Sequence, residues 1–246
     1  MRLAHWFVDP LVRFNFLDRS LALGAQAFGA LIPLLIVLQV GSRALPEDLI
    51  ERFDLEDDAA ESVREAFAVA DEQSTTTALS VVVLVVSVLS FTRRLQRLYE
   101  STWELETRGL RGTGWGLAWI GFLLLYGTLH PVLDGLAGGL VGVALSLAGA
   151  FLVGVLTPYL LLGRRLPWRR LVPQAGLTAA GLTALGIWSA IYMPRAFEAS
   201  AAAYGSIGIA FALLTWLWGL GIVLVVAAVY GSPQVKWPPP LITRRG

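Results

Sequence analysis

The stretch YGSIGIAFALLTWLWGLGIVLVVAAVYG, residues 204–231, decides the fold of this chain. It contains no charged residue, and beyond its opening glycines it stays apolar over the about 20 residues that a helix needs to cross a bilayer. A helix that is hydrophobic on every side belongs in a membrane or in a deep core. The stretch therefore predicts a spanning helix over 207–230. Tyr204 is expected at the membrane interface, and Trp216 on the bundle or lining a cavity.

Five further apolar segments repeat this pattern along the chain. They cover residues 21–40, 76–92, 115–131, 140–162 and 174–193. Hydrophobic residues make up 56% of the 246 residues and charged residues only 15%, whereas about 25% of the residues in soluble domains are charged. We therefore predict an all-α fold, a polytopic membrane helical bundle with six transmembrane helices over residues 21–231.

The residues before the first span predict a helix that lies on the membrane surface. Leu3, Phe7 and Leu11 recur at helical spacing between charged residues, and Pro10 predicts a bend. We interpret residues 1–20 as an amphipathic interfacial segment, with a frayed cytosolic tail as the alternative. Residues 232–246 are interpreted as a cytoplasmic tail.

The basic residues predict the orientation of the bundle. Of the 19 Lys and Arg residues, 15 fall on the side of the N-terminus and four on the other side. Positively charged loops stay in the cytoplasm, so both termini are expected there. The arginine-rich loops on that side are expected to attract anionic lipids. A net charge of +1 gives no reason to expect a nucleic-acid partner.

The loop between the first two spans, residues 41–75, is strongly acidic. Eleven of the 18 Asp and Glu residues lie in it, and the helical spacing of its apolar residues predicts one or two short amphipathic helices outside the bilayer. The charge has two interpretations, a cation-attracting or lid-like element and a solvated helical hairpin.

Small residues predict how the helices pack, because they let helix backbones approach closely in lipid. The fourth span carries five of them at intervals of four: Gly138, Gly142, Ser146, Ala150 and Gly154. This ridge is long enough to pack against a neighbouring helix or against a second copy of the chain. The fifth span carries a similar face at Gly176, Ala180 and Ala184.

Polar residues and prolines at membrane depth are candidate positions of a solute pathway, because polar groups are costly there. They are Gln26, Pro33, His130, Asp134, Arg195 and Glu198. The last four group at the outer ends of the third and fifth spans, which predicts either a polar vestibule or a rim of ordinary ion pairs. For Gln26, a hydrogen bond between helices is the alternative to a solute contact.

No enzyme motif accompanies these features. The chain contains no cysteine, and its two histidines fall on opposite sides of the predicted membrane. We therefore expect no catalytic residue, no metal site and no cofactor, and interpret the protein as a non-enzyme.

The second half of the chain resembles the YihY/BrkB family of bacterial inner-membrane proteins. The residues that carry the resemblance are RLPWRRLVPQAGLTAAGLTALGIWSAIY, residues 165–192, and the Tyr204–Gly208 cluster that opens the last span. The family's carboxylate and Asn near the end of that span are absent here, where Ala228–Gly231 stand. The resemblance implies a six-span protein of the bacterial cytoplasmic membrane, with a transporter role proposed for the family.

Two functions are compatible with this sequence. The first is a transporter or permease-like protein for a small or amphipathic solute, which the proline-broken spans, the small-residue faces and the scattered polar groups favour. The second is a non-transporting cell-envelope scaffold that binds protein or lipid partners through its charged loops.

Overall fold

The computed structural model describes residues 2–39, 77–136 and 139–235 together with six positions of the acidic loop, Glu47, Ile50, Glu51, Ala60, Glu61 and Arg64. The chain divides into two compact units. Unit 1 comprises Met1–Ser20, Thr92–Thr183 and Ile222–Gly246, and unit 2 comprises Leu21–Phe91 and Ala184–Gly221.

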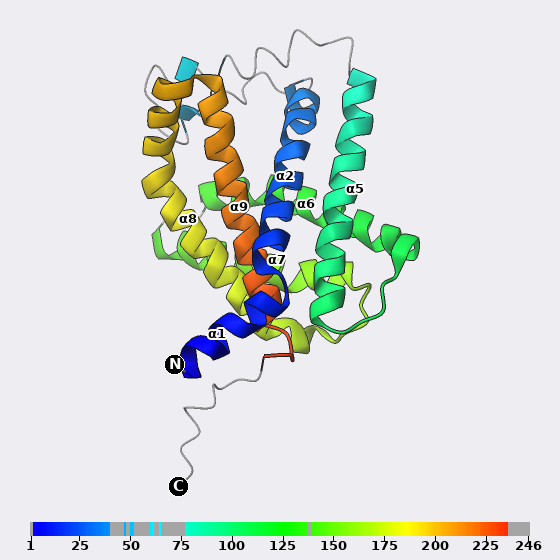
Figure 1. Cartoon of the computed structure of the whole chain (residues 1–246). Helices are drawn as coiled ribbons and strands as arrows, with labels where there is room; N and C mark the ends of the chain where they lie inside the picture. Colours follow the sequence, from blue (N-terminus) through cyan, green and yellow to red (C-terminus); the bar gives the residue numbers. More distant parts are fainter. Residues whose placement is uncertain are drawn as a thin grey trace. The chain divides into compact units, whose positions relative to one another are not determined.

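The described residues form helices and no strand, which confirms the all-α prediction for this part of the chain (Figure 1). The helices are α1 (Arg2–Arg13), α2 (Phe16–Gln39), α5 (Thr77–Thr102), the short 3₁₀ helix η2 (Gly109–Gly112), α6 (Thr113–Leu136), α7 (Gly139–Leu161), α8 (Trp168–Tyr204) and α9 (Ser206–Tyr230). Each predicted span lies within one of these helices or extends one residue beyond it. Helix α1 includes Pro10, as the predicted interfacial helix does.

Within the described part, three helices are long and apolar enough to cross a membrane: Val141–Leu161, Trp168–Tyr204 and Ser206–Tyr230. A shorter apolar helix covers Thr113–Leu129. In α5 the apolar residues end near Thr92, where a series of arginines begins, so its apolar part is only about 23 Å long at ~1.5 Å per residue. The three long apolar helices in α7, α8 and α9 make the chain compatible with a membrane protein. The count of six spans stays a prediction.

The connection between the fifth and sixth predicted spans differs from the expected loop over residues 194–206. Helix α8 continues as one helix of 37 residues to Tyr204, and α9 begins after Gly205 alone (Figure 1). Gly205 has φ +59°, a left-handed conformation that only glycine adopts without strain. Its N–H donates to the Ala201 carbonyl at 2.7 Å and ends α8, and its own carbonyl accepts from Gly208 N–H at 3.0 Å.

The two helices of this hairpin pack on a buried cluster inside unit 2. The cluster contains Met193, Phe197, Ala201, Ile209 and Ala212, with Ile50, Leu213 and Trp216 packed against it. A Cβ on Gly208 would strike the Ser200 carbonyl, so the close crossing requires glycine at that position. Ile50 shows that the acidic loop contributes an apolar side chain to this core.

The described positions of the acidic loop are helical, in agreement with the predicted amphipathic helices. Arg64 donates from Nε and Nη2 to the two carboxylate oxygens of Glu47, at 3.0 and 3.2 Å. This exposed bidentate pair lowers the pKa of Glu47. Ala60 is buried.

The small-residue ridge of α7 packs against α8 at its Gly154 end. A Cβ there would lie 2.9 Å from both the Cα and the carbonyl oxygen of Ala175 on α8. Gly142, Ser146 and Ala150 are half-buried, and Gly138 lies outside the described residues. The expected small face of α8 was misassigned by one position, because Gly176 and Ala180 are exposed whereas Ala175, Thr178 and Ala179 are buried.

Two glycines of α2 provide a direct test of helix packing in unit 2. A Cβ on Gly24 would lie 2.8 Å from Cα of Trp218 on α9, whereas a Cβ on Gly29 would meet nothing within 4 Å. We expect Gly24→Ala to destabilise the protein by about 1–3 kcal/mol because the helices must separate. Gly29→Ala is the matched control, with an expected change within about 0.5 kcal/mol. Thermal unfolding in detergent measures both, and equal effects would contradict the close α2–α9 contact.

Candidate functional site

The candidate site surrounds Glu100, a buried carboxylate on the last turns of α5. The residue is only 1% exposed. Its Oε1 accepts three hydrogen bonds, from Arg165 Nη2 at 2.7 Å, Gln96 Nε2 at 3.0 Å and the backbone N–H of Arg108 at 3.2 Å. A buried carboxylate is stable as an anion only when it is paired and hydrogen-bonded, and these three donors meet that requirement.

Arg165 reaches this carboxylate because of the turn that ends α7. Gly163 has φ +62°, its N–H donates to Leu160 O, and Arg164 N–H donates to Tyr159 O. This pair of bonds is the Schellman motif that commonly ends a helix at glycine. Beyond the turn, the guanidinium of Arg165 also donates to the carbonyls of Leu162 (2.9 Å) and Glu106 (2.8 Å). Arg165 therefore joins α5, the connection after α5 and the α7–α8 turn.

A second group of polar side chains lies around Gln174 on α8. Gln174 is fully buried and its Oε1 accepts a hydrogen bond from Trp103 Nε1 at 2.9 Å. Its Nε2 has no acceptor among the described residues. Burial raises the pKa of the neighbouring Tyr99 phenol, partly offset by the Gln174 amide, so Tyr99 stays neutral throughout the physiological pH range. Gly231, after α9, passes against Gln174, and a Cβ there would collide with it.

Two further contacts attach segments near the chain ends of unit 1 to the end of α5 and to the connection after it. Arg19 Nη1 donates to Ser101 Oγ at 2.6 Å, and Gln234 Nε2 donates to Glu104 Oε1 at 2.9 Å. Ser232 and Val235 are buried, so the segment predicted as a cytoplasmic tail is packed on unit 1 as far as residue 235. The polar residues around Glu100 and Gln174 are together called the α5 cluster. Its members are Gln96, Tyr99, Glu100, Trp103, Arg165 and Gln174.

The structure assigns different environments to the residues predicted from the sequence. Gln26 Oε1 is buried and has no donor among the described residues. Trp216 Nε1 donates to Ser189 Oγ at 2.6 Å inside the α8–α9 hairpin, so this tryptophan packs on the bundle. Tyr204 is 73% exposed, as an interfacial residue would be.

Of the polar group predicted at the outer ends of the spans, the structure describes the side chains of Arg195 and Glu198 only. Arg195 lies within α8 rather than in a loop and donates to the Ile191 carbonyl at 2.8 Å. No ion pair is described between Arg195 and Glu198, although both lie on the same helix. Pro33, His130 and Asp134 belong to helices, but their side chains lie outside the described residues.

The α5 cluster was missed by sequence reasoning. Glu100 stands among arginines in a loop-like segment, and its partner Arg165 is 65 positions away. Three acids, Glu100, Glu104 and Glu106, stand between two arginine-rich segments, and nothing in the local sequence marks Glu100 among them. Among the described residues no three His, Cys, Asp or Glu side chains gather as metal ligands. The cluster is therefore an ion-pair and hydrogen-bond network in which Glu100 Oε1 accepts from three donors, and it links α5, the connection after α5 and the α7–α8 turn.

Comparisons with known proteins add no relative: no protein-family model, no curated protein and no solved structure matches this chain. The resemblance to the YihY/BrkB family accordingly stays a prediction from the quoted residues. Function has to be argued from the site itself.

The ion pair predicts a specific pattern of stability in mutants. Glu100→Gln and Arg165→Met are each expected to cost about 3–5 kcal/mol, because each leaves a buried polar group without its partner. The double variant should cost clearly less than the two single effects together. Unfolding in detergent measures the cycle, with Glu106→Gln as the control for an exposed acid on the same connection. Additive effects would mean that Glu100 and Arg165 are not coupled.

Proposed function

We propose that this protein is an integral, multi-pass protein of the bacterial cytoplasmic membrane, with six spans and both termini in the cytoplasm. Three long apolar helices in the described part support the membrane assignment. The 15-to-4 distribution of basic residues supports the orientation. In this orientation the α5 cluster lies on the cytoplasmic side, together with the loops expected to attract anionic lipids.

Within that membrane, we propose that the protein moves a small or amphipathic solute. The observation that carries this proposal is the side-chain oxygen of Gln26, which is buried without a hydrogen-bond donor among the described residues. A buried acceptor left unsatisfied costs about 1–3 kcal/mol, and such groups in native proteins are usually explained by water, an ion or a functional role. A solute or water that donates a hydrogen bond would satisfy Gln26.

The α5 cluster supplies an element that a transporter needs on its inner side. Transport requires a protein to open toward each side in turn, and therefore requires contacts that hold one state and break in the other. Arg165 connects three segments through one side chain, so its release would free all three together. We propose that the Glu100–Arg165 pair holds the cytoplasmic side closed.

Flux measurements test the transport proposal. The full chain is reconstituted into liposomes and tested with labelled ions, sugars, amino acids and a lysophospholipid. For a transported solute, Gln26→Leu is expected to lower the flux about tenfold, the equivalent of one lost hydrogen bond. Ala25→Leu, at an exposed position beside it, is the control and should retain the flux. Folded protein that moves none of these solutes would contradict the proposal for this panel.

The orientation is tested by labelling single cysteines, because the natural chain contains none. Glu61→Cys, in the acidic loop, should react with a membrane-impermeant maleimide in intact cells. Thr107→Cys, in the connection after α5, should react only after the cells are opened. Both positions are exposed, so accessibility depends on the side of the membrane. The reverse pattern would overturn the assigned orientation.

A scaffold that binds an envelope partner is the second candidate. It is favoured by an exposed apolar surface at the α8–α9 turn. Tyr204 at the end of α8, and Ile207 and Phe211 at the start of α9, are each more than 60% exposed. Contiguous exposed apolar side chains mark surfaces that bind proteins or lipids. A Phe211→Ser variant that loses a co-purifying partner while flux is absent in the wild type would favour this function over transport.

A further inference from the structure

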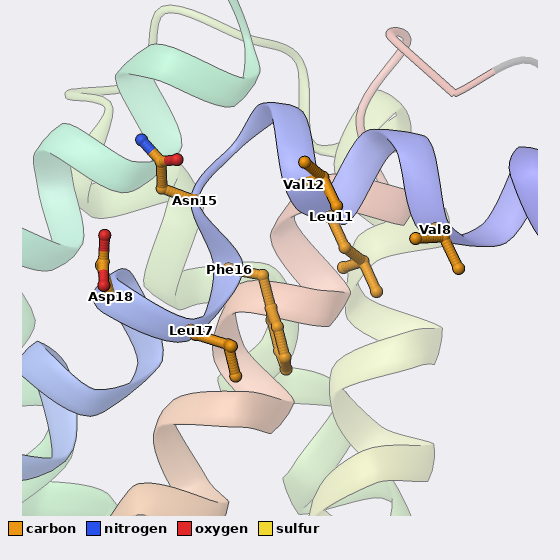
Figure 2. Close-up of a pocket in the computed structure, with 7 residues that line it drawn as sticks. All are labelled: Val8, Leu11, Val12, Asn15, Phe16, Leu17 and Asp18. Carbon is orange, nitrogen blue, oxygen red and sulfur yellow. The ribbon is translucent and has the colours of Figure 1, made fainter.

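The elbow between α1 and α2 borders an open hollow of about 420 Å³ (Figure 2). Asn15 forms the bend with φ +46°, a conformation that Asn tolerates better than most residues. Its N–H donates to Val12 O and its carbonyl accepts from Arg19 N–H, both at 3.0 Å. The bend thus ends one helix and begins the next, and it gives the hollow a fixed shape.

The lining of this hollow is amphipathic. Five apolar side chains line it, Val8, Leu11, Val12, Phe16 and Leu17, together with the polar Asn15 and Asp18. Figure 2 shows Asn15 and Asp18 together at one end and the apolar side chains extending away from them. We call this surface the elbow groove.

The apolar part of the elbow groove is open to its surroundings. Val12 and Leu17 are 68% and 62% exposed. Apolar side chains exposed singly are ordinary, but a contiguous group in a concave surface marks a binding site. In water this exposure would be unfavourable by about 25 cal/mol per Å², whereas a hydrocarbon chain lying in the groove would cover it.

The charges around the polar end select the kind of headgroup. Asp18 is the charged residue of the lining, and its carboxylate favours an ammonium group. Arg13, exposed in the last turn of α1, provides a cation two residues before the bend that suits a phosphate. A zwitterionic phospholipid with a primary ammonium group, such as phosphatidylethanolamine, carries both charges next to its acyl chains.

We propose that the elbow groove binds one phospholipid with an ammonium-bearing headgroup, with an acyl chain along Val8, Val12 and Leu17 and the headgroup at Asp18. The inference rests on the proposed membrane location. It differs from the general attraction of anionic lipids to the arginine-rich loops, because here the lining charge is negative. An anionic lipid such as phosphatidylglycerol lacks the ammonium group and would meet an unfavourable carboxylate.

Lipid retention tests this proposal. The full chain is purified in detergent, supplied with equal amounts of phosphatidylethanolamine and phosphatidylglycerol, and the bound lipids are counted by native mass spectrometry. We expect the wild type to retain phosphatidylethanolamine preferentially. Asp18→Asn should lower that preference about tenfold, because a charge-assisted hydrogen bond is lost. Leu17→Gln should weaken retention of both lipids.

Leu21→Gln is the matched control, since Leu21 lies one turn further along α2, is 52% exposed and does not line the groove. Its lipid retention should equal that of the wild type. Thermal unfolding of each variant confirms that the fold is retained. Equal retention of the two lipids by the wild type, or equal effects of Leu17→Gln and Leu21→Gln, would overturn the proposal.

Extraction with alkaline carbonate distinguishes a failure of the membrane assignment from a failure of the elbow-groove proposal. A chain that alkaline carbonate extracts from membranes is not integral, and both proposals would then be rejected. An integral chain whose lipid retention is unaffected by Asp18→Asn would reject the elbow groove alone.

Discussion

The buried ion pair between Glu100 and Arg165 is the interaction on which the organisation of unit 1 depends. A carboxylate that is 1% exposed is tolerable only while its donors remain in place, because an uncompensated buried charge costs several kcal/mol. Its donors come from α5 itself, from the connection after α5 and from the α7–α8 turn. One buried charge therefore joins the end of α5 and the connection after it to the α7–α8 turn, 65 positions away.

Small residues make some of the closest contacts between the described helices. Gly154 against Ala175, and Gly24 against Trp218, bring helix backbones together without intervening side chains. In lipid, where apolar burial gives no preference for helix–helix over helix–lipid contact, such close packing is what holds helices together. The α5 cluster adds the electrostatic contact that glycine packing lacks.

The sequence was sufficient to predict the helices, because uninterrupted apolar stretches such as residues 207–230 have no other stable arrangement in a membrane. It was insufficient at residues 194–206, which were expected to connect the fifth and sixth spans as a short outer loop. The helix continues there to Tyr204 and ends at Gly205, whose left-handed conformation begins the turn into α9. The small face of α8 was misassigned for a related reason, since spacing by four fits several faces and only the neighbouring helix selects one.

The candidate site was less predictable than the fold. Gln26 was singled out from the sequence, because a polar amide within an apolar segment is visible there. Glu100 was not, because local spacing carries no information about a partner 65 positions away. Gln174 was included in a predicted span as an ordinary first residue, although it is fully buried beside Tyr99 and Trp103. Pairings of this kind can be predicted only when the conformation of the connecting turns, such as the one at Gly163, is known.

Amide hydrogen exchange at Arg108 tests the central claim most directly, because this N–H donates to the Glu100 carboxylate. The measurement compares the wild type with Arg165→Met, and uses the amides around Ile209 in the α8–α9 hairpin as the internal reference. We expect much faster exchange at residues 105–108 in the variant, with unchanged exchange at the hairpin. Unchanged exchange at Arg108 would contradict it, since the carboxylate would then be held without Arg165.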